Sequence, residues 1–600
     1  MPTAIVTGQP VPGSSLESDL RSLGFDVRMA EGTAETETLL AAAPAGDRVA
    51  VVDAGFVGHV HALRLGLTDP RFPLAAVPGA VTAQPAARQA LTRAVARETS
   101  SGGGTAVAVG SLADRIVTEL DADGSEVHRP ELGSLVAVVP ADPQARNEAR
   151  QAVAAVDDEA VRLKSAVKSR DGFFTTYCIS PYSRYLARWC ARRGLTPNQV
   201  TTASLLTALI AAGCAATGTR GGFIAAGVLL IASFVLDCTD GQLARYALKY
   251  STLGAWLDAT FDRAKEYAYY AGLALGAARG GHDDVWALAL GAMVLQTCRH
   301  VVDFSFNEAN HDATANTSPT AALSDKLDSV GWTVWVRRMI VLPIGERWAM
   351  IAVLTALTTP RITFYALLVG CAFAATYTTA GRVLRSLTRK AHRTDRAAQA
   401  LADLADSGPL SEAVGRVARR GLPGLAVPAV ALLGGAAVVA CSAFSGYGSV
   451  VPVIGALVYV LTSALAVARP LKGALDWLVP PFFRAAEYGT VLALAGKAGV
   501  NGALPAAFGL VAAVAYHHYD TVYRIRGNAG APPAWLVRSI GGHDGRTLLV
   551  TVLAAALTAA QFTAALTVLA VIVALVVLAE SIRFWVSAGA PAVHDEGETA

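Results

Sequence analysis

Apolar residues gather in two long blocks that together occupy most of the chain after residue 198. In the first block, apolar runs occur at 199–218, 221–243, 255–278, 285–306, 340–359 and 362–384. Each run is close to the roughly 20 residues that cross a bilayer as a helix. A polar linker at 386–420 leads to a second block at 421–586, where we expect about six more spans. The pattern therefore predicts an all-α polytopic membrane bundle of two halves.

The first 155 residues follow a different pattern. Short apolar runs at 4–7, 49–52, 106–109 and 135–139 alternate with amphipathic helical stretches. That alternation is typical of a parallel sheet flanked by helices, so we expect a soluble α/β domain at 1–155. The chain starts without the basic residues and long apolar run of a signal peptide, which indicates a cytoplasmic N-terminus.

Two further segments flank the apolar blocks. Between 156 and 198, basic residues such as Arg184 and Arg188 interleave with aromatic residues such as Tyr185 and Trp189. This mixture favours a juxtamembrane helix at the membrane surface, although a solvated connector would also fit. The tail at 587–600 is acidic and is expected to be disordered.

Composition and charge support a membrane protein. Hydrophobic residues make up 53% of the chain and charged residues only 16%, and the mean hydropathy is +0.42. These values are too apolar for an ordinary soluble protein. The net charge of +3 gives no signal for nucleic-acid binding. Basic residues precede the first span at Arg192 and Arg193 and follow the sixth at Arg382 and Arg385. This bias predicts a multi-pass protein of the cell membrane with both ends of the first bundle in the cytoplasm.

A cluster of carboxylates, small residues and one arginine lies where the second expected span ends and the third begins. Its members are Asp237, Asp240, Gly241, Ala244, Arg245, Gly254, Asp258 and Asp262. Helical positions three or four residues apart share a face, so two helix faces bring the four carboxylates together. Carboxylates within a membrane are costly and need a functional reason. Helix caps or salt bridges would explain one or two of them, but not eight positions at fixed spacings.

The residue types in this cluster indicate a metal and phosphate site. Four neighbouring carboxylates need cations, and oxygen ligands select Mg²⁺, Mn²⁺ or Ca²⁺. Two such ions can hold a pyrophosphate. The small side chains at Gly241, Ala244 and Gly254 let a nucleotide approach the backbone, and Arg245 offers donors to phosphate. Asp262 is placed to accept a proton from an attacking hydroxyl.

The spacing resembles that of the CDP-alcohol phosphotransferase family, D-x-x-D-G-x-x-A-R-x8-G-x3-D-x3-D, in full, and the resemblance covers roughly 160–385. It implies two divalent ions, Mg²⁺ or Mn²⁺, and a general base at Asp262. The implied metal ligands are Asp237, Asp240, Asp258 and Asp262. The implied CDP-binding residues are Asp237, Asp240, Gly241, Ala244, Arg245, Gly254 and Asp258.

The reaction implied by the resemblance is transfer of a phosphatidyl or polar headgroup unit from a CDP-linked donor, such as CDP-diacylglycerol, to a hydroxyl acceptor. The reaction releases CMP and belongs to phospholipid biosynthesis. Two alternatives stay open: a transferase that joins two soluble polar headgroups of the inositol-phosphate type, and a non-catalytic membrane scaffold or transporter built from two related halves.

The N-terminal domain departs from the expected pattern of an active partner enzyme. The stretches 168–172 and 180–184 are similar to a subgroup in which a cytidylyltransferase domain precedes the transferase. Such a domain opens with a Gly-rich loop that ends in a basic residue, whereas this chain has no basic residue before Arg21. We therefore interpret residues 1–155 as a degenerate nucleotidyltransferase-like domain that is a relic or a binding module.

The second apolar block looks like a degenerate copy of the first. Arg263, Glu266, His300 and Asp303 line up with Arg484, Glu487, His517 and Asp520. In the same alignment the four carboxylates become Leu461, Ala464, Val479 and Phe483. We interpret the retained polar residues as interhelical pairs. Chance similarity of apolar helices is the alternative, and a duplication would make the protein a pseudo-dimer within one chain.

Overall fold

The computed structural model describes residues 1–9, 11–101, 110–168, 171–281, 283–313, 335, 339–388, 391–417, 422 and 424–587. The strand expected at 106–109 and residues 588–600 of the tail lie outside the described residues. The chain divides into two compact units. The first comprises Met1–Ser169, Tyr182–Pro197 and Thr239–Ser251, and the second comprises Arg170–Pro181, Asn198–Cys238 and Thr252–Ala600.

The N-terminal domain contains a five-stranded sheet in the order β2-β1-β3-β6-β5. Its strands are β1 (Thr3–Thr7), β2 (Asp26–Ala30), β3 (Val49–Asp53), β5 (Leu74–Val77) and β6 (Ala80–Ala83). The sheet is mixed rather than parallel, because β6 pairs antiparallel with both β3 and β5. Pro78 and Gly79, whose φ is +79°, form the whole connection between β5 and β6, and so short a link joins only antiparallel strands. The run expected at 135–139 contains β7 (Ala137–Val138), which pairs with β4 (Val57–Gly58) in a separate sheet.

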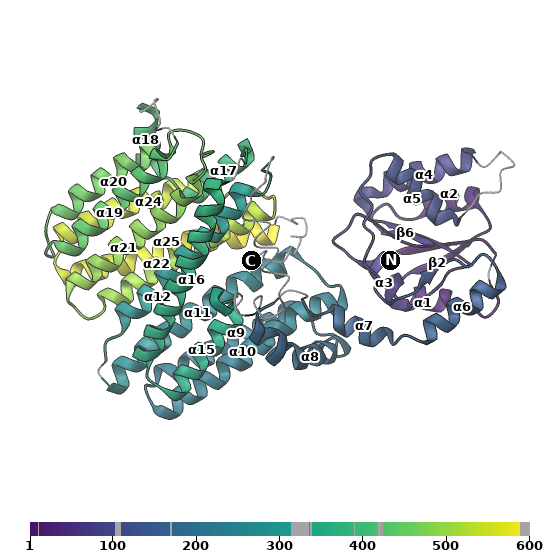
Figure 1. Ribbon diagram of the computed structural model, residues 1–600, viewed down its shortest axis with the longest axis horizontal. Coiled ribbons are helices and arrows are strands. Elements are labelled where there is room, and N and C mark those ends of the chain that lie inside the picture. The colour runs from purple at the N-terminus through teal and green to yellow at the C-terminus, as the bar shows by residue number, and fades with distance from the viewer. Residues whose placement is uncertain are drawn as a thin grey trace. The chain divides into compact units, whose positions relative to one another are not determined.

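Helices cover both faces of this sheet (Figure 1). They are α1 (Leu16–Ser22), α2 (Thr33–Ala42), α3 (Val60–Thr68), α4 (Arg88–Ser101) and α5 (Leu112–Ala122). Ile5 packs in the apolar core with α2, α4 and α5, whereas Ala4 and Val6 pack in the core with α1 and α3. Alternate side chains of a strand point to opposite faces, which explains why β1 is apolar at every position. The expected α/β domain is confirmed.

The segment after the sheet is helical. It contains α6 (Pro143–Ala154), α7 (Asp158–Ser165), a π-helical turn (Thr175–Ile179) and α8 (Ser180–Arg192). Along α8, Tyr182, Tyr185 and Trp189 are exposed, while Ala187 and Cys190 are buried. The helix is therefore amphipathic, with aromatic residues on its exposed face. Its position at a membrane surface stays a prediction.

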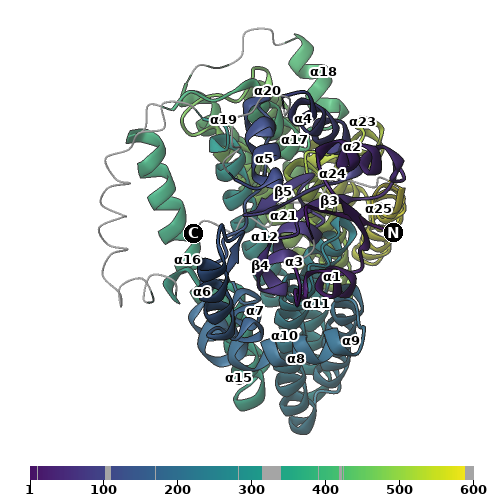
Figure 2. The same cartoon turned by 90° about the vertical axis from the view of Figure 1, so that its right-hand side faces the viewer.

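The first bundle contains one helix for each of the six apolar runs expected between 199 and 384. These are α9 (Pro197–Ala216), α10 (Arg220–Ala247), α11 (Thr252–Gly281), α12 (Trp286–Asn310), α15 (Ile344–Leu357) and α16 (Pro360–Thr388). The second bundle has α19 (Ala426–Phe444), α20 (Val451–Val467), α21 (Val479–Ala498), α22 (Ala503–Arg526), α24 (Gly542–Ala556) and α25 (Ala559–Ser587), with a short 3₁₀ turn (Asp476–Leu478) and α23 (Ala534–Ser539) between them. Helices α19 and α20 run side by side in both views (Figure 1, Figure 2).

The two bundles share one apolar core. Helix α12 contacts α21 and α22, and α11 contacts α22 and α25. Leu273 and Met293 of the first bundle lie in the same buried cluster as Val491, Val511 and Leu566 of the second. The second bundle therefore covers one flank of the first.

Five of the described helices, α9, α10, α16, α19 and α25, are long and apolar enough to cross a membrane. Helices α15, α20 and α24 are shorter than 18 residues, and α11 carries several ionic side chains. Helix length and composition thus support a membrane bundle preceded by a soluble α/β domain, although fewer helices qualify as spans than the two sets of six that we expected.

The segment 386–420 is more ordered than the polar linker that the sequence suggests. It contains α17 (Asp395–Ala405) and α18 (Pro409–Val417). Ala397, Leu401 and Leu404 recur at helical spacing and form an apolar face that is buried. Helix α17 packs through this face against α12, α21 and α22.

Candidate active site

Three carboxylates converge where α10 ends and α11 begins. Asp237 and Asp240 lie one turn apart on α10, and Asp258 lies on the second turn of α11. One carboxylate oxygen from each lies within 4.8 Å of the others. The chain reverses between the helices over a few residues, beginning at Leu248, which adopts a left-handed φ of 49°. Helical spacing and this short connection produce the convergence that the sequence predicts for these three residues.

The fourth predicted carboxylate has a different partner. Asp262 lies one turn after Asp258 on α11 and is not a member of the three-residue group. Its Oδ1 forms an ion pair with Lys265 Nζ at 2.9 Å. Lys265 also pairs with Asp237. The Lys265 side chain is 0% exposed, so a buried ammonium joins the two carboxylates.

Lys265 is a site residue that the sequence analysis missed, and Ser204 is another. Lys265 Nζ donates to Ser204 Oγ at 3.2 Å. Ser204 and Ser233 donate to each other's backbone carbonyls at 2.9 and 2.8 Å, which joins α9 to α10 beside the ammonium. The ring of Trp348 lies 5.4 Å from Lys265 Nζ. The signal for Lys265 was its i+3 spacing from Asp262, which is also common on exposed helix surfaces.

The remaining predicted residues lie on the same two helix segments. Gly241 and Ala244 follow Asp240 on the last turns of α10, and Gly254 lies in the first turn of α11, one turn before Asp258. A Cβ atom at Gly241 would lie 3.5 Å from the guanidinium nitrogens of Arg245. Arg245 Nε donates to the Ala166 carbonyl at 2.6 Å. This bond directs part of the guanidinium to the chain after α7.

The last turn of α10 is fixed by side chains from α3 and α7. Arg162 Nε donates to the Tyr246 carbonyl at 2.9 Å, and its guanidinium lies 3.7 Å from the Tyr246 ring centroid. Tyr246 Oη donates to Glu159 at 2.9 Å, and Arg64 Nη2 donates to the Ala247 carbonyl at 3.0 Å. These bonds hold the backbone that follows Asp240 and Gly241.

Behind the carboxylates, a buried ion triad joins α11 to α15. Glu266 Oε2 accepts from Arg263 Nη1 at 3.0 Å, and Glu266 Oε1 accepts from Arg347 Nε at 3.0 Å. Tyr270 Oη donates to the same Oε1 atom at 2.6 Å. Arg263 and Glu266 follow Asp262 directly on α11, so the triad fixes the rotation of the helix that carries Asp258 and Asp262.

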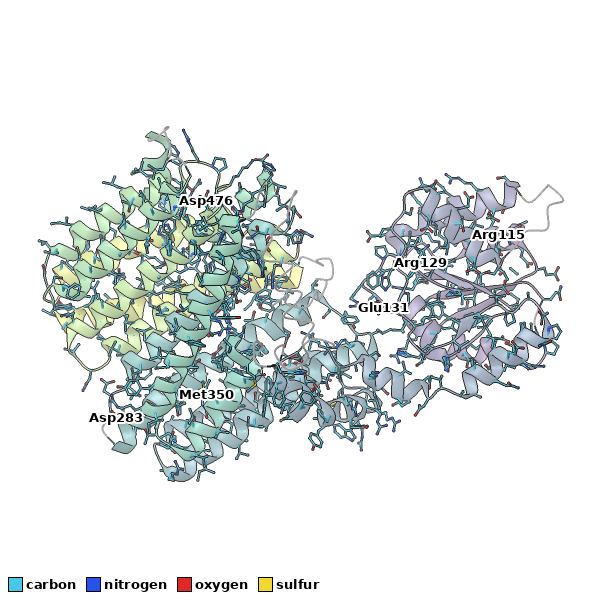
Figure 3. All side chains as sticks on the ribbon, in the orientation of Figure 1. Arg115, Arg129, Glu131, Asp283, Met350 and Asp476 are labelled. Atoms are coloured by element: carbon cyan, nitrogen blue, oxygen red, sulfur yellow. The ribbon has the colours of Figure 1, made fainter. Side chains whose placement is uncertain are left out.

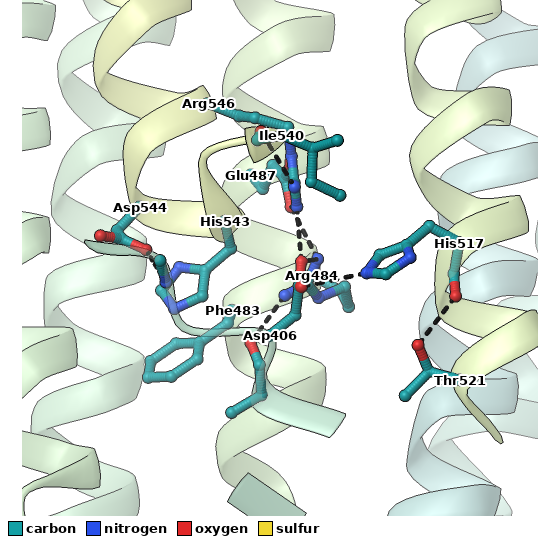
Figure 4. Close-up of polar contacts among 12 residues, drawn as sticks. Asp406, Phe483, Arg484, Glu487, His517, Thr521, Ile540, His543, Asp544 and Arg546 are labelled. Atoms are coloured by element: carbon teal, nitrogen blue, oxygen red, sulfur yellow. Dashed lines mark hydrogen bonds and ion pairs between the residues drawn. The ribbon is translucent and has the colours of Figure 1, made fainter. Parts of the chain in front are cut away.

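The second bundle contains a triad with the same atoms in the same roles (Figure 4). Glu487 Oε2 accepts from Arg484 Nη1 at 2.8 Å, and Glu487 Oε1 accepts from Arg546 Nε at 2.6 Å. Arg484 and Glu487 lie on the third long helix of this bundle and Arg546 on the fifth, as in the first bundle. Asp406, which follows α17, adds acceptors for Arg546 at 2.8 Å and His517 at 3.2 Å. Glu487 therefore pairs with an arginine of another helix, as the sequence suggests, whereas Arg484 and Glu487 pair within α21.

The carboxylate cluster itself has no equivalent at the aligned positions of the second bundle. Ala464, Val479 and Phe483 are fully buried, while Leu461 is 52% exposed. The Phe483 ring stacks on His543 with 4.3 Å between centroids. Among the described residues, Asp237, Asp240 and Asp258 form the single group of potential metal ligands that lie close enough to share an ion.

Comparison with known proteins divides the membrane part of the chain in two. Residues 194–376 match the model of the CDP-alcohol phosphatidyltransferase family. Residues 395–600 match a family of unknown function, DUF5941. The match to the first family includes every residue of the carboxylate cluster, whereas the second bundle lies within the residues that match the other family.

Several curated proteins are similar to part of the chain. A phosphatidylinositol phosphate synthase of Streptomyces avermitilis is 37% identical over 131 residues, which is 21% of this chain and 51% of that protein. An archaetidylinositol phosphate synthase of Pyrococcus horikoshii is 36% identical over 91 residues, 15% of this chain and 47% of that protein. A bifunctional IPC transferase and DIPP synthase of Aquifex aeolicus is 31% identical over 114 residues, 19% of this chain and 26% of that protein. The chain thus spans about half, or less, of the length of these relatives.

The candidate spans and the family match agree with the sequence-based expectation of a multi-pass membrane protein. Asp237, Asp240 and Asp258 lie within the matched residues 194–376 and converge at one point. Residues 194–376, which include the carboxylate cluster, are therefore similar to the CDP-alcohol phosphatidyltransferase family.

Proposed function

We propose that this protein transfers a phosphoryl-alcohol unit from a CDP-linked donor to an acceptor hydroxyl and releases CMP, with the help of a divalent metal ion. The observation that carries the proposal is the convergence of Asp237, Asp240 and Asp258 within 4.8 Å, inside the segment that matches the transferase family. A non-catalytic scaffold would have no use for three neighbouring carboxylates in the bundle, where each ionised group is costly.

The donor set fits a hard divalent cation. All three groups are carboxylates, and oxygen ligands suit Mg²⁺ or Mn²⁺. Asp237, Asp240 and Asp258 would hold the ion, which would supply positive charge for the pyrophosphate of the donor. Gly241, Ala244, Arg245 and Gly254 flank these ligands and are the residues that we expect to contact CDP.

Asp262 is the proposed general base. The acceptor oxygen forms a bond to the β-phosphorus of the donor, and the bond from that phosphorus to the oxygen of CMP breaks. The proton of the acceptor hydroxyl moves to Asp262, whose side chain is 17% exposed and can be reached by a substrate. The ion pair with Lys265 favours the ionised form of Asp262, which is the form that accepts a proton.

The names of the relatives suggest the substrate class. The Streptomyces relative is named a phosphatidylinositol phosphate synthase and the Pyrococcus relative an archaetidylinositol phosphate synthase. We therefore propose a CDP-linked lipid such as CDP-diacylglycerol as donor and a phosphorylated polyol such as inositol phosphate as acceptor. The soluble alternative pairs a polar CDP-alcohol with a polar acceptor, as the name of the Aquifex relative would allow.

CMP release from inside-out membrane vesicles tests this proposal. CDP-diacylglycerol with inositol phosphate should give CMP, and the acceptor should be used only in inside-out vesicles because we expect the site to face the cytoplasm. CMP from a polar CDP-alcohol alone would favour the soluble alternative. Release of no CMP from any donor and acceptor pair would contradict an enzymatic role and favour a scaffold or transporter.

The N-terminal domain should not activate CTP. The turn between β1 and α1 has no basic residue, and the first one, Arg21 on α1, pairs with Glu17 at 2.6 Å. Phosphate groups of a bound nucleotide would therefore lack a cation at this turn. Full-length protein given CTP and a phosphorylated alcohol should release no pyrophosphate above the level of a sample without protein. Stoichiometric pyrophosphate release would refute the interpretation as a degenerate domain.

We further propose that the second bundle is a non-catalytic copy of the first, so that one chain forms a pseudo-dimer. The matching ion triads of Glu266 and Glu487 support this proposal. The fifth helices of the two bundles, α15 and α24, also end in the same way. The Thr358 N–H donates to the Leu354 carbonyl at 2.8 Å after α15, and the Leu557 N–H donates to the Leu553 carbonyl at 3.0 Å after α24.

A further inference from the structure

We propose that Lys265 is a built-in cation of the active site that takes the place of a second divalent ion, so that the site binds a single ion at Asp237, Asp240 and Asp258. This inference rests on the proposed function for the identity of the site. It differs from the two-ion arrangement that the family resemblance implies, and it assigns a role to a residue outside the family motif.

The first argument is the surroundings of the ammonium. Lys265 Nζ donates hydrogen bonds to Asp237 and to Ser204 Oγ at 3.2 Å, and it forms an ion pair with Asp262 Oδ1 at 2.9 Å. Trp348 lies beside it, with its ring centroid at 5.4 Å. A buried ammonium with two hydrogen bonds and two carboxylates beside it is compensated by its surroundings, as a buried charge must be.

The second argument is the division of the four carboxylates. Three of them form the group that can share one ion, whereas the fourth, Asp262, lies outside that group and pairs with the ammonium, as Asp237 also does. A second divalent ion between Asp237 and Asp262 would have to occupy the space beside an ammonium of the same charge sign. The Lys265 side chain is 0% exposed, so its ammonium faces the carboxylates and not solvent.

The third argument comes from the second bundle. When Arg484 and Glu487 are aligned with Arg263 and Glu266, the position of Lys265 corresponds to Ala486, which is buried. The ion triad is present in both bundles, whereas the lysine is absent where the carboxylates are absent. Lys265 is therefore present only in the bundle that has the carboxylates, and the other bundle packs without a lysine at this position.

The number of bound Mn²⁺ ions per chain tests the inference. Purified full-length protein is titrated with Mn²⁺ alone, bound metal is counted by equilibrium dialysis, and the electron paramagnetic resonance spectrum reports whether two ions lie close together. The wild type should bind one Mn²⁺ with an uncoupled spectrum. Lys265→Ala and Lys265→Met should bind a second ion at least about tenfold more tightly than the wild type does, since the competing positive charge is gone, and should show spin coupling.

One control variant and one further measurement make the outcome specific. Lys497→Ala, at an exposed lysine near the end of α21, should leave the metal count at one. Because Lys265→Ala leaves two buried carboxylates without their cation, its melting temperature should rise more on addition of Mn²⁺ than that of the wild type.

Two spin-coupled Mn²⁺ ions in the wild type would overturn the role of Lys265 and leave the proposed function standing. No bound Mn²⁺ in wild type or variants would overturn the metal assignment of the proposed function and, with it, the inference.

Discussion

Replacing Asp262 by asparagine should lower the rate of CMP release by about 10²- to 10⁴-fold, the contribution expected of a general base. Asparagine has nearly the same shape as aspartate but cannot take up the proton of the attacking hydroxyl. CDP binding should change far less, because Asp262 lies outside the group formed by Asp237, Asp240 and Asp258. Rates of CMP release and direct CDP binding, measured on the same preparation, separate the two effects.

The three clustered carboxylates should behave differently from Asp262. Asp237→Asn, Asp240→Asn or Asp258→Asn should abolish CMP release and weaken metal binding together, because each removes a ligand of the same ion. Excess EDTA should have the same effect on the wild type.

Asp283 provides the matched control, as it is a carboxylate in the connection after α11 (Figure 3) that accepts from Arg361 Nε at 3.0 Å. Asp283→Asn should retain normal turnover. Full turnover by the wild type in excess EDTA would contradict the metal assignment, and normal turnover by Asp262→Asn would remove Asp262 from the chemistry.

Local spacing explains which parts of the site could be predicted from the sequence. Asp237 and Asp240 share a helix face through their i+3 spacing, and Asp258 faces them because the connection between α10 and α11 is short. Lys265 has the same kind of spacing from Asp262, but a lysine on a helix usually points to solvent. Its burial depends on contacts with Ser204 and Trp348, which lie on other helices, and the sequence does not show such packing.

The same distinction applies to the fold. The six apolar runs of the first block became six helices because length and hydropathy are properties of a single segment. The sequence predicts a polar linker where α17 lies, because the apolar face of Ala397, Leu401 and Leu404 is short and lies among charged neighbours. That face finds its partners on α12, α21 and α22. The pairing of β6 with β3 likewise depends on a contact between segments that are distant in sequence.

The second large effect that we expect concerns stability rather than chemistry. Glu487→Gln should destabilise the second bundle by about 3–5 kcal/mol, the usual cost of removing one partner from a buried ion pair. Glu487 lies between Arg484 and Arg546, and its side chain is 3% exposed. Without its charge, the two guanidinium groups would repel each other, and Asp406 would be left to compensate both.

Hydrogen exchange followed by mass spectrometry should locate this loss. Amide protection should fall in α21 and α24, which the triad joins, and then in α12, which packs against α21. Glu412→Gln is the matched control, because that carboxylate is 33% exposed and pairs with Arg538 at 3.2 Å; an exposed pair contributes at most about 1 kcal/mol. CMP release per folded molecule should persist in Glu487→Gln, since no residue of the triad belongs to the carboxylate cluster. Wild-type protection in this variant would show that the triad does not hold the second bundle together, and loss of turnover in a fully folded variant would show that the second bundle takes part in the reaction.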